Sequence, residues 1–223
     1  MKLSKETLEV LKNFASINNG LEFKEGNVLS TMSASKTVLV RAELKDSFPE
    51  TFCVYDLNQF LSVYSINKDP EIDFDEFNVI FKTQRSKTRY RKTAKHMIVT
   101  APDKSLNIGE PDVAFTLSQE DYRDIIDSAK VLQSPHIAVE STGDKIVLTC
   151  YNAKDDSAHT NSIEVAEGNG NSFKVVFLTE NIKMITGSYD VEISFKGFTS
   201  FTNKVSNIQY WIASEAKESN YGG

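Results

Sequence analysis

Two stretches of the chain share one pattern of hydrophobic and polar positions. Residues 3–18 read LSKETLEVLKNFASIN, and residues 117–132 read LSQEDYRDIIDSAKVL. In each stretch apolar residues recur every three or four positions, as on one side of an amphipathic helix. The serine near the start of each pattern is a typical N-cap. The pattern therefore predicts a helix that begins after Ser4 and ends near Ile17, and a second helix that begins after Ser118.

Between these helices the hydrophobic pattern shortens to runs that are typical of β-strands. Residues 18–32 predict a hairpin that turns at Glu25 and Gly26. Residues 52–66 begin as a strand and continue as a short helix, for which Asp56 is the candidate N-cap. Further strands are expected at residues 36–44, at residues 71–82 and on to the run HMIVTA at residues 96–101.

The second half of the chain repeats this order. Residues 136–152 predict a hairpin that turns at Gly143 and Asp144. A polar loop is expected at residues 152–165, and residues 173–185 again run from a strand into a short helix. The closing strands are expected at residues 189–198 and 208–214.

The spacing of matching residues indicates an internal duplication. Leu117 follows Leu3 by 117 − 3 = 114 positions, and Asn181 follows Asn58 by 181 − 58 = 123 positions. The interval returns to 114 where HMIVTA matches YWIASE, so insertions in one half are balanced in the other. Because the order of elements persists while their spacing drifts, two copies of one unit explain the pattern.

A polar stretch, PDKSLNIGEP, connects the two copies and is bracketed by Pro102 and Pro111. We expect a first unit at residues 1–104, a connection at residues 105–116 and a second unit at residues 117–223. Helices that are interspersed with runs of antiparallel strands indicate an α+β fold. A chain of 223 residues is long enough to bury a core of ordinary size in each unit.

Composition and charge narrow the classes of function. The formal net charge of −6 and the pI of about 5.2 argue against non-specific nucleic-acid binding by the surface as a whole, although an average conceals any local basic surface. Cys53 and Cys150 stand alone in apolar runs and are expected to be reduced thiols in the core. No stretch approaches the roughly 20 apolar residues that cross a bilayer, so we expect a soluble intracellular protein with no membrane partner.

The sequence offers little that could form a catalytic site. It has no glycine-rich phosphate loop, no histidine pair at metal-ligand spacing and no cysteine cluster. His96, which is expected in a strand, His136 and His159 are isolated, and the acidic runs at residues 73–76 and 154–157 coincide with expected turns. We therefore predict no catalytic residue, no metal ligand and no cofactor. An enzyme of small α+β type would need titratable groups gathered in a concave site.

Each predicted long helix carries two cations on its polar side. Lys5 and Lys12 lie within about 20° of each other on the first helix, and Arg123 and Lys130 do so on the second. One acid lies near each pair, so the faces are only mildly positive. A solvated helix face explains either pair alone. The duplication, however, places both pairs in equivalent positions on equivalent units, which favours a shared function.

A second basic feature is KTQRSKTRYRKTAKH at residues 82–96, which holds seven cations and no acid. Four of the cations alternate, and an extended strand would place them on one face: Arg85, Lys87, Arg89 and Arg91. One interpretation is an edge that binds phosphate or an acidic partner. The other is a sheet edge that its charges protect from aggregation.

Four motifs carry a resemblance to a known family. MKLSKETLEVLKNFASINNG opens the chain, YDLNQFL lies at residues 55–61, VTAPDK at 99–104 and IQYWIASEA at 208–216. In this order, and from end to end, the chain resembles the DNA polymerase sliding clamps of T4-type bacteriophages. Residues 75–97 are more basic than the family's pattern, so no site is carried over through them.

The resemblance implies a clamp fold and an assembly. In this family each unit has two helices on one face of antiparallel sheets, and six units close a ring whose hole twelve helices line. Two units in each chain then imply a homotrimer with head-to-tail contacts. Strands that join across each subunit boundary would cover sheet edges that an isolated chain exposes.

The resemblance also implies a function without catalysis. The ring encircles duplex DNA without reading its sequence and tethers the replicative DNA polymerase for processive synthesis. Expected partners include an ATP-driven clamp loader and late-transcription proteins, in the cytoplasm of the infected bacterial host.

Two groups of residues follow from the resemblance as candidate sites. The residues expected to face DNA are Lys5, Lys12, Arg123 and Lys130, with Lys2 and Lys183 as further candidates. Partners of this family insert hydrophobic tails near the junction of units, here expected around Ile98, Val99 and Leu106.

A second hypothesis keeps the fold without the ring. A monomeric processivity factor would hold DNA electrostatically, for example through residues 82–96. The salt dependence of DNA binding distinguishes a closed ring from such a monomer, because only phosphate contacts weaken steeply with salt.

Overall fold

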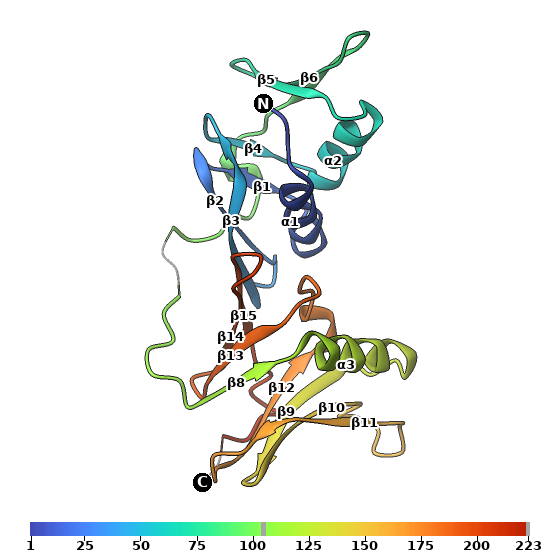
Figure 1. Ribbon diagram of the computed structural model, residues 1–223, viewed down its shortest axis with the longest axis vertical. Helices are drawn as coiled ribbons and strands as arrows, with labels where there is room; N and C mark the ends of the chain where they lie inside the picture. The colour runs from blue at the N-terminus through green and yellow to red at the C-terminus, as the bar shows by residue number, and fades with distance from the viewer. Residues whose placement is uncertain (104–105, 222–223) are drawn as a thin grey trace. The chain divides into compact units, whose positions relative to one another are not determined.

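The computed structural model describes residues 1–103 and 106–221. The chain divides into two compact units, Met1–Ser105 with Ser206–Ile208, and Leu106–Val205 with Gln209–Gly223. The boundary expected at Lys104 and Ser105 falls on two residues outside the described ranges. In Figure 1 most of the first unit runs from blue to green, and the second runs from green to red.

The first unit combines α-helices with small antiparallel sheets (Figure 1). Its helical segments are α1 (Lys5–Ile17), α2 (Leu57–Ile66) and the single 3₁₀ turn η1 (Lys95–Met97). Its strands are β1 (Leu21–Phe23), β2 (Gly26–Met32), β3 (Val38–Phe48), β4 (Phe52–Val54), β5 (Glu71–Phe74), β6 (Asn78–Lys82) and β7 (Lys87–Arg91). Strand β1 pairs with β4, β2 pairs with β3, and β5, β6 and β7 form a three-stranded sheet.

Helix α1 begins and ends where the sequence predicts. Ser4 is its N-cap and accepts a hydrogen bond from the Thr7 amide at 3.2 Å. The Asp46 carboxylate of β3 accepts two further hydrogen bonds, from the Ser4 amide at 2.7 Å and from Ser4 Oγ at 2.8 Å. These bonds join the start of the helix to the sheet. The buried side of the helix consists of Thr7, Val10, Leu11 and Phe14.

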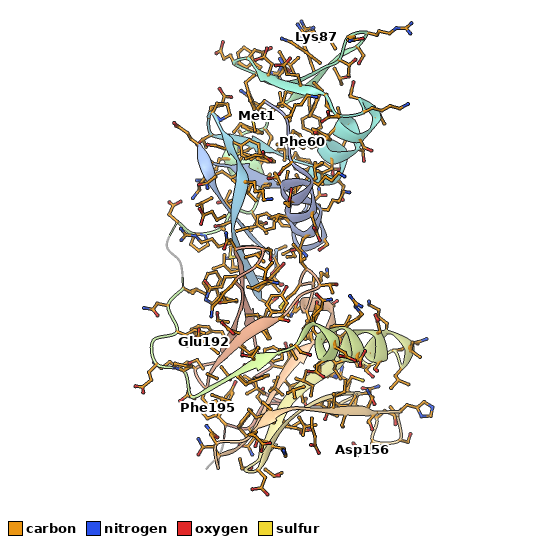
Figure 2. The ribbon with its side chains drawn as sticks, viewed as in Figure 1. Met1, Phe60, Lys87, Asp156, Glu192 and Phe195 are labelled. Carbon is orange, nitrogen blue, oxygen red and sulfur yellow. The ribbon has the colours of Figure 1, made fainter. Side chains whose placement is uncertain are left out.

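Helix α2 covers an aromatic cluster, with Phe60 at its centre (Figure 2). Asp56 is its N-cap, as predicted. The Phe60 ring centroid lies 5.4 Å from Phe23, 5.2 Å from Phe81 and 5.5 Å from Tyr90. These rings belong to β1, β6 and β7, so one fully buried side chain holds α2 against two sheets of the first unit.

The hairpin predicted at residues 18–32 is wrong. Strands β1 and β2 do not pair with each other, because β1 pairs with β4 in a register that places Phe23 opposite Phe52. Their rings stack with centroids 4.6 Å apart and planes 8° apart. Gly26 takes a φ of +99°, which redirects the chain into β2 beside β3.

The strand predicted for HMIVTA is also wrong. His96 lies in the 3₁₀ turn, where the amides of Met97 and Ile98 donate to carbonyls three residues back. Ile98 packs on Gly20, where an added Cβ would lie 2.6 Å from Ile98 Cγ2. Ile212, its match by spacing, lies in a strand, so equal intervals did not identify equivalent structure here.

The second unit is organised in the same way around one long helix. Its elements are β8 (Val113–Leu117), α3 (Gln119–Val131), β9 (His136–Thr142), β10 (Lys145–Tyr151), β11 (Asn161–Glu167), β12 (Ser172–Leu178), the 3₁₀ turn η2 (Thr179–Asn181), β13 (Tyr189–Ser194), β14 (Phe198–Asn203) and β15 (Ile208–Ala213). One sheet has the order β11-β10-β9-β12, and β15, β14, β13 and β8 follow each other in another. Strand β8 begins inside the stretch that was expected as the connection.

The predicted Ser118 helix and the hairpin at residues 136–152 are confirmed. Ser118 Oγ accepts from the Asp121 amide at 3.1 Å, and β9 and β10 meet at a turn where Gly143 has a φ of +119°. The polar loop expected at residues 152–165 ends earlier, at residue 160, because β11 pairs with β10 from Asn161 onward.

The short helix expected within residues 173–185 is reduced to the single turn η2. Its start lacks a side-chain cap, whereas α2 has Asp56. Three β-branched residues follow within six positions, and such residues are poor helix formers: Ile182, Ile185 and Thr186. Gly187 then packs closely against Asn203, since a Cβ added to Gly187 would lie 2.3 Å from Asn203 Nδ2. The expectation of two α-helices in each unit therefore fails for the described part of the second unit.

The duplication itself is confirmed by the order of elements. Each unit shows a long helix, four strands, a helical segment and three strands in the same order. By this order β3 corresponds to β11, and β7 corresponds to β15.

The two cysteines and the single tryptophan of the sequence are buried in the cores. Cys53 and Cys150 are buried free thiols, as predicted. Trp211, the only tryptophan of the sequence, is buried in β15, and its Nε1 has no hydrogen-bond partner among the described residues.

Replacement of Phe60 by alanine should lower the free energy of unfolding by about 3–5 kcal/mol, because it removes the ring that joins α2 to two sheets. The exposed Ile66 of the same helix offers a matched control, since Ile66→Ala should change it by less than about 0.5 kcal/mol. Denaturant titration of both variants measures the difference. Equal losses would contradict the assigned role of the aromatic cluster.

The Asp46 carboxylate should make stability depend on acid pH. Burial raises its pKa, but hydrogen bonds from Thr7 and Ser4 outweigh burial, and the pKa lies below its usual value. A lowered pKa in the folded state gives stability that is present above the unfolded value of about 3.9 and is lost as pH falls through the folded value. The melting temperature should therefore fall less between about pH 5 and pH 3 in Asp46→Asn than in the parent chain. The exposed Asp156→Asn is the control and should keep the pH dependence of the parent chain. The same dependence in Asp46→Asn would contradict this prediction.

Candidate nucleic-acid interface

The exposed side of α1 presents the first predicted pair of cations. Lys5 and Lys12 are exposed, and helical geometry places them roughly 160° from the centre of the buried side. Neither lysine forms a salt bridge with any described residue. Glu9 lies between them on the same side, so the face combines two free cations with one acid.

The corresponding pair on α3 lies differently. Arg123 and Lys130 are exposed, but they lie only roughly 120° from the buried side, on the flank of the helix. Lys130 also forms a salt bridge of 3.0 Å with Asp127, which lies nearer the centre of the exposed side. The expectation that the two pairs occupy equivalent positions is therefore wrong.

The net charge of α3 is negative. The helix holds two cations against four acids, a sum of 2 − 4 = −2: Glu120, Asp121, Asp124 and Asp127. The acids of its first turn stabilise the positive end of the helix dipole, and Lys130 stabilises the negative end. These charges therefore stabilise the helix itself, independently of any contact with a partner.

A concavity beside α3 joins two of the predicted cations. Lys130 and Lys183 both line a depression of about 610 Å³, together with Ile126, Leu178 and Ile182. The sequence placed these lysines 53 positions apart (183 − 130), and the fold brings them to one surface of the second unit. Glu180 also lines this depression, so its charged side chains are two cations and one acid on an otherwise largely apolar lining.

Lys2 is unlike the other candidates, because it is paired within its own unit. Its Nζ lies 2.6 Å from Asp69 Oδ2, and this hydrogen bond raises the pKa of Lys2. Both side chains are exposed, so the pair contributes little to stability. The pairing leaves Lys2 with less free charge for a phosphate than Lys5 or Lys12.

The basic segment at residues 82–96 divides into paired and unpaired cations. Lys82, Lys92 and Lys95 form salt bridges with acids of the first unit at 2.5–2.8 Å. The four alternating cations form no salt bridge with the described residues: Arg85, Lys87, Arg89 and Arg91. They lie on β7 and on the turn before it, and β7 is an edge strand as predicted. Arg91 lies over the exposed Phe77 ring at 5.4 Å.

The expected partner-binding residues differ in accessibility. Ile98 is half-buried on Gly20, and the Val99 carbonyl accepts a hydrogen bond from Asn18 at 2.8 Å. Val99 is exposed in the first unit and Leu106 in the second. Met97, which is 56% exposed two positions before Val99, was not among the residues expected from the sequence. An apolar residue within a basic stretch was the feature of the sequence that could have indicated this exposed position.

The described residues show no group of three or more metal-binding side chains. His136 is buried and its Nδ1 accepts from the Ala153 amide at 3.3 Å, whereas His96 and His159 are exposed. The largest pKa displacements belong to tyrosines in the core of the second unit, where burial raises the pKa of Tyr122, Tyr189 and Tyr210. No helix among the described residues is long and apolar enough to cross a membrane.

Comparison with known proteins gives the same family along nearly the whole chain. A family described as DNA polymerase processivity factor matches residues 4–100. The sliding clamp of Vibrio phage KVP40 is 33% identical over 222 residues, which cover 97% of this chain and 100% of that protein. The sliding clamp of Enterobacteria phage T4 is 32% identical over 202 residues, which cover 88% of this chain and 89% of that protein.

Similarity to a solved structure confirms the fold. The A. fulgidus PCNA bound to the C-terminal region of FEN-1 aligns with a TM-score of 0.70, and the alignment covers 96% of this chain and 97% of that one at 13% identity. The α+β clamp fold expected from the sequence is therefore confirmed. The chain belongs to the sliding clamp family of T4-type bacteriophages, the processivity factors of DNA polymerase.

Proposed function

We propose that three copies of this chain close a ring around duplex DNA and tether a replicative DNA polymerase to it without catalysing a reaction. The observation that carries the proposal is the match to curated sliding clamps along nearly the whole chain, combined with two units of the same element order. Two units per chain supply six units from three copies, and head-to-tail contacts close such a ring.

The charges of the long helices support weak contact with DNA. Lys5 and Lys12 can meet phosphates, α2 carries no charged residue, and α3 is net negative. Phosphate contacts carry no sequence information, and few of them leave the ring free to slide. Retention then comes from closure of the ring, which the net charge of −6 does not oppose.

The remaining partners of this proposal follow from the family. An ATP-driven clamp loader would open the ring, and late-transcription proteins would use it as the polymerase does, in the cytoplasm of an infected bacterial host. Exposed apolar side chains suit the insertion of a partner's hydrophobic tail. The first unit offers Met97 and Val99 for this purpose, and the second offers Leu106.

One observation favours the alternative of a monomer that holds DNA electrostatically. Four cations at residues 85–91 have no salt-bridge partner in the described parts of the chain, and phosphates would satisfy them. Salt distinguishes the alternatives, since release of counterions makes open phosphate binding fall steeply as salt rises.

The ring should survive salt on circular DNA and should be lost from linear DNA. The chain is loaded onto nicked plasmid with a clamp loader and ATP, the salt is raised to about 1 M, and the DNA-bound fraction is isolated by gel filtration. We expect retention on the closed circle and release after a restriction enzyme cuts it. Loss from the uncut circle at high salt would support the electrostatic monomer instead.

The paired substitution Lys12→Glu with Lys130→Glu should impair loading or processive synthesis by about two- to tenfold, because it places acids where phosphates pass. The trimer should remain intact. A control with the same change of charge is Lys36→Glu with Lys154→Glu, at two exposed positions in turns outside the helices. Primer extension with loader and polymerase measures the effect. Equal activity of both double variants would contradict the assigned DNA-facing surface.

A further inference from the structure

The middle of the short strand β1 holds a buried carboxylate. Glu22 is 8% exposed and stands between Leu21 and Phe23, which are buried as well. In the pair of β1 with β4 it lies opposite Cys53, another buried residue. A charged carboxylate is costly in such surroundings unless a cation compensates it. Packing of the core alone therefore does not explain why a glutamate occupies this position.

The cation comes from a segment that lies against β1 and β4. Residues 93–99, here termed the strap, begin where the Thr93 amide donates to the Cys53 carbonyl at 2.9 Å, and they contain η1, the green turn beside β1 and β4 in Figure 1. Within the strap, Lys95 Nζ lies 2.8 Å from Glu22 Oε1. Lys95 is the only salt-bridge partner of Glu22 in the described part of the chain. One exposed side chain of the strap thus compensates the buried acid.

Few other contacts hold the strap in place. Ile98 is half-buried and packs on Gly20, and the Val99 carbonyl accepts a hydrogen bond from Asn18 at 2.8 Å. Residues 94–97 are all exposed, so the strap buries little apolar surface of its own. Its position on the sheet therefore depends strongly on the ion pair.

The ion pair and the closed strap stabilise each other. Without Lys95, the Glu22 carboxylate would be buried and uncompensated as long as the strap lies over it. Displacement of the strap would let water reach the carboxylate and relieve that cost. Replacement of both partners by apolar residues also removes the cost, because no charge then remains to be solvated.

The strap carries two exposed apolar side chains of the first unit, Met97 and Val99. They flank Ile98 in the sequence, and Ile98 is the residue that anchors the strap on Gly20. A surface that is ordered before binding loses less conformational entropy when a partner's hydrophobic tail is inserted. The group that orders the strap therefore affects how well these two side chains can bind a partner.

We infer that Glu22 is a positioning residue for partner binding, because it fixes the strap through Lys95 and so orders the docking surface at Met97 and Val99. The inference rests on the proposed function and names the buried group behind one of its surfaces. Two other lysines of the basic segment, Lys82 and Lys92, pair with acids whose side chains are 55% and 41% exposed. Lys95 differs from them in that its partner is buried.

A double-mutant cycle tests the ion pair. The variants are Lys95→Met, Glu22→Leu and the chain that carries both, and hydrogen-exchange mass spectrometry follows the strap. The amides of Met97 and Ile98 donate to carbonyls within the turn at 3.0 and 3.3 Å, so their exchange reports its opening. We expect Lys95→Met to exchange at least about tenfold faster there, since it leaves Glu22 buried without a partner. Glu22→Leu alone should have a smaller effect, because Lys95 is exposed, and the double variant should return to within about threefold of the parent.

Processive synthesis tests the role in partner binding. The clamp concentration that gives half-maximal primer extension with loader and polymerase should rise at least about threefold in Lys95→Met and should recover in the double variant. The rate at saturating clamp should stay unchanged, because the strap affects binding of the partner and not its chemistry. The control Lys45→Met removes a lysine from an exposed ion pair with Glu6 in the same unit and should alter neither measurement. Circular dichroism establishes that each variant is folded.

Three results would overturn the inference. Equal exchange in Lys95→Met and Lys45→Met, or no recovery in the double variant, would show that the ion pair does not hold the strap. A strap that opens in Lys95→Met with no change in the half-maximal concentration would leave the ion pair without a role in partner binding. A parent chain that does not stimulate the polymerase would refute the proposed function, and the positioning role with it, whatever the exchange rates are.

Discussion

An antiparallel sheet of a few strands has two edges, and each edge must be paired, covered or protected by charge. In this chain that constraint organises both units. A backbone pair at Met1 closes one sheet of the first unit, and a pair at Asn220 closes one sheet of the second. The opposite edges of these two sheets, β7 and β11, lie in segments of opposite charge. Each of these two sheets therefore keeps one edge without a second strand among the described residues.

The charge distribution on the helices explains how a protein of net negative charge can work on DNA. A helix that faces phosphates does not need to be strongly basic if a closed path around the duplex prevents escape. The acids of α3 stabilise its own N-terminus, and its cations lie on the flank. In the proposed ring, affinity for any one stretch of duplex would be low, which suits a protein that moves along it.

Periodicity predicted the elements whose burial follows a regular spacing. Helices α1, α2 and α3 were placed with their caps because a Ser or Asp stands directly before each apolar pattern. Pairing was harder to predict, because it depends on contacts distant in sequence. Strand β1 is buried on both faces and pairs with β4, and no local signal distinguishes this arrangement from a hairpin.

The candidate site was predictable to a similar extent. Exposure of Lys5, Lys12 and Arg123 follows from helical spacing, but the salt bridge between Lys2 and Asp69 depends on tertiary structure. The same is true of the concavity shared by Lys130 and Lys183.

The position of Trp211 has a practical consequence. Because this side chain is the only indole in the sequence and is buried in β15, tryptophan fluorescence, excited selectively over the tyrosines, monitors the surroundings of this one strand. An unfolding curve followed by tryptophan emission would report on that single position, whereas far-ultraviolet dichroism averages over both units. Divergence between the two signals would therefore reveal whether the halves of this duplicated chain melt together or in succession.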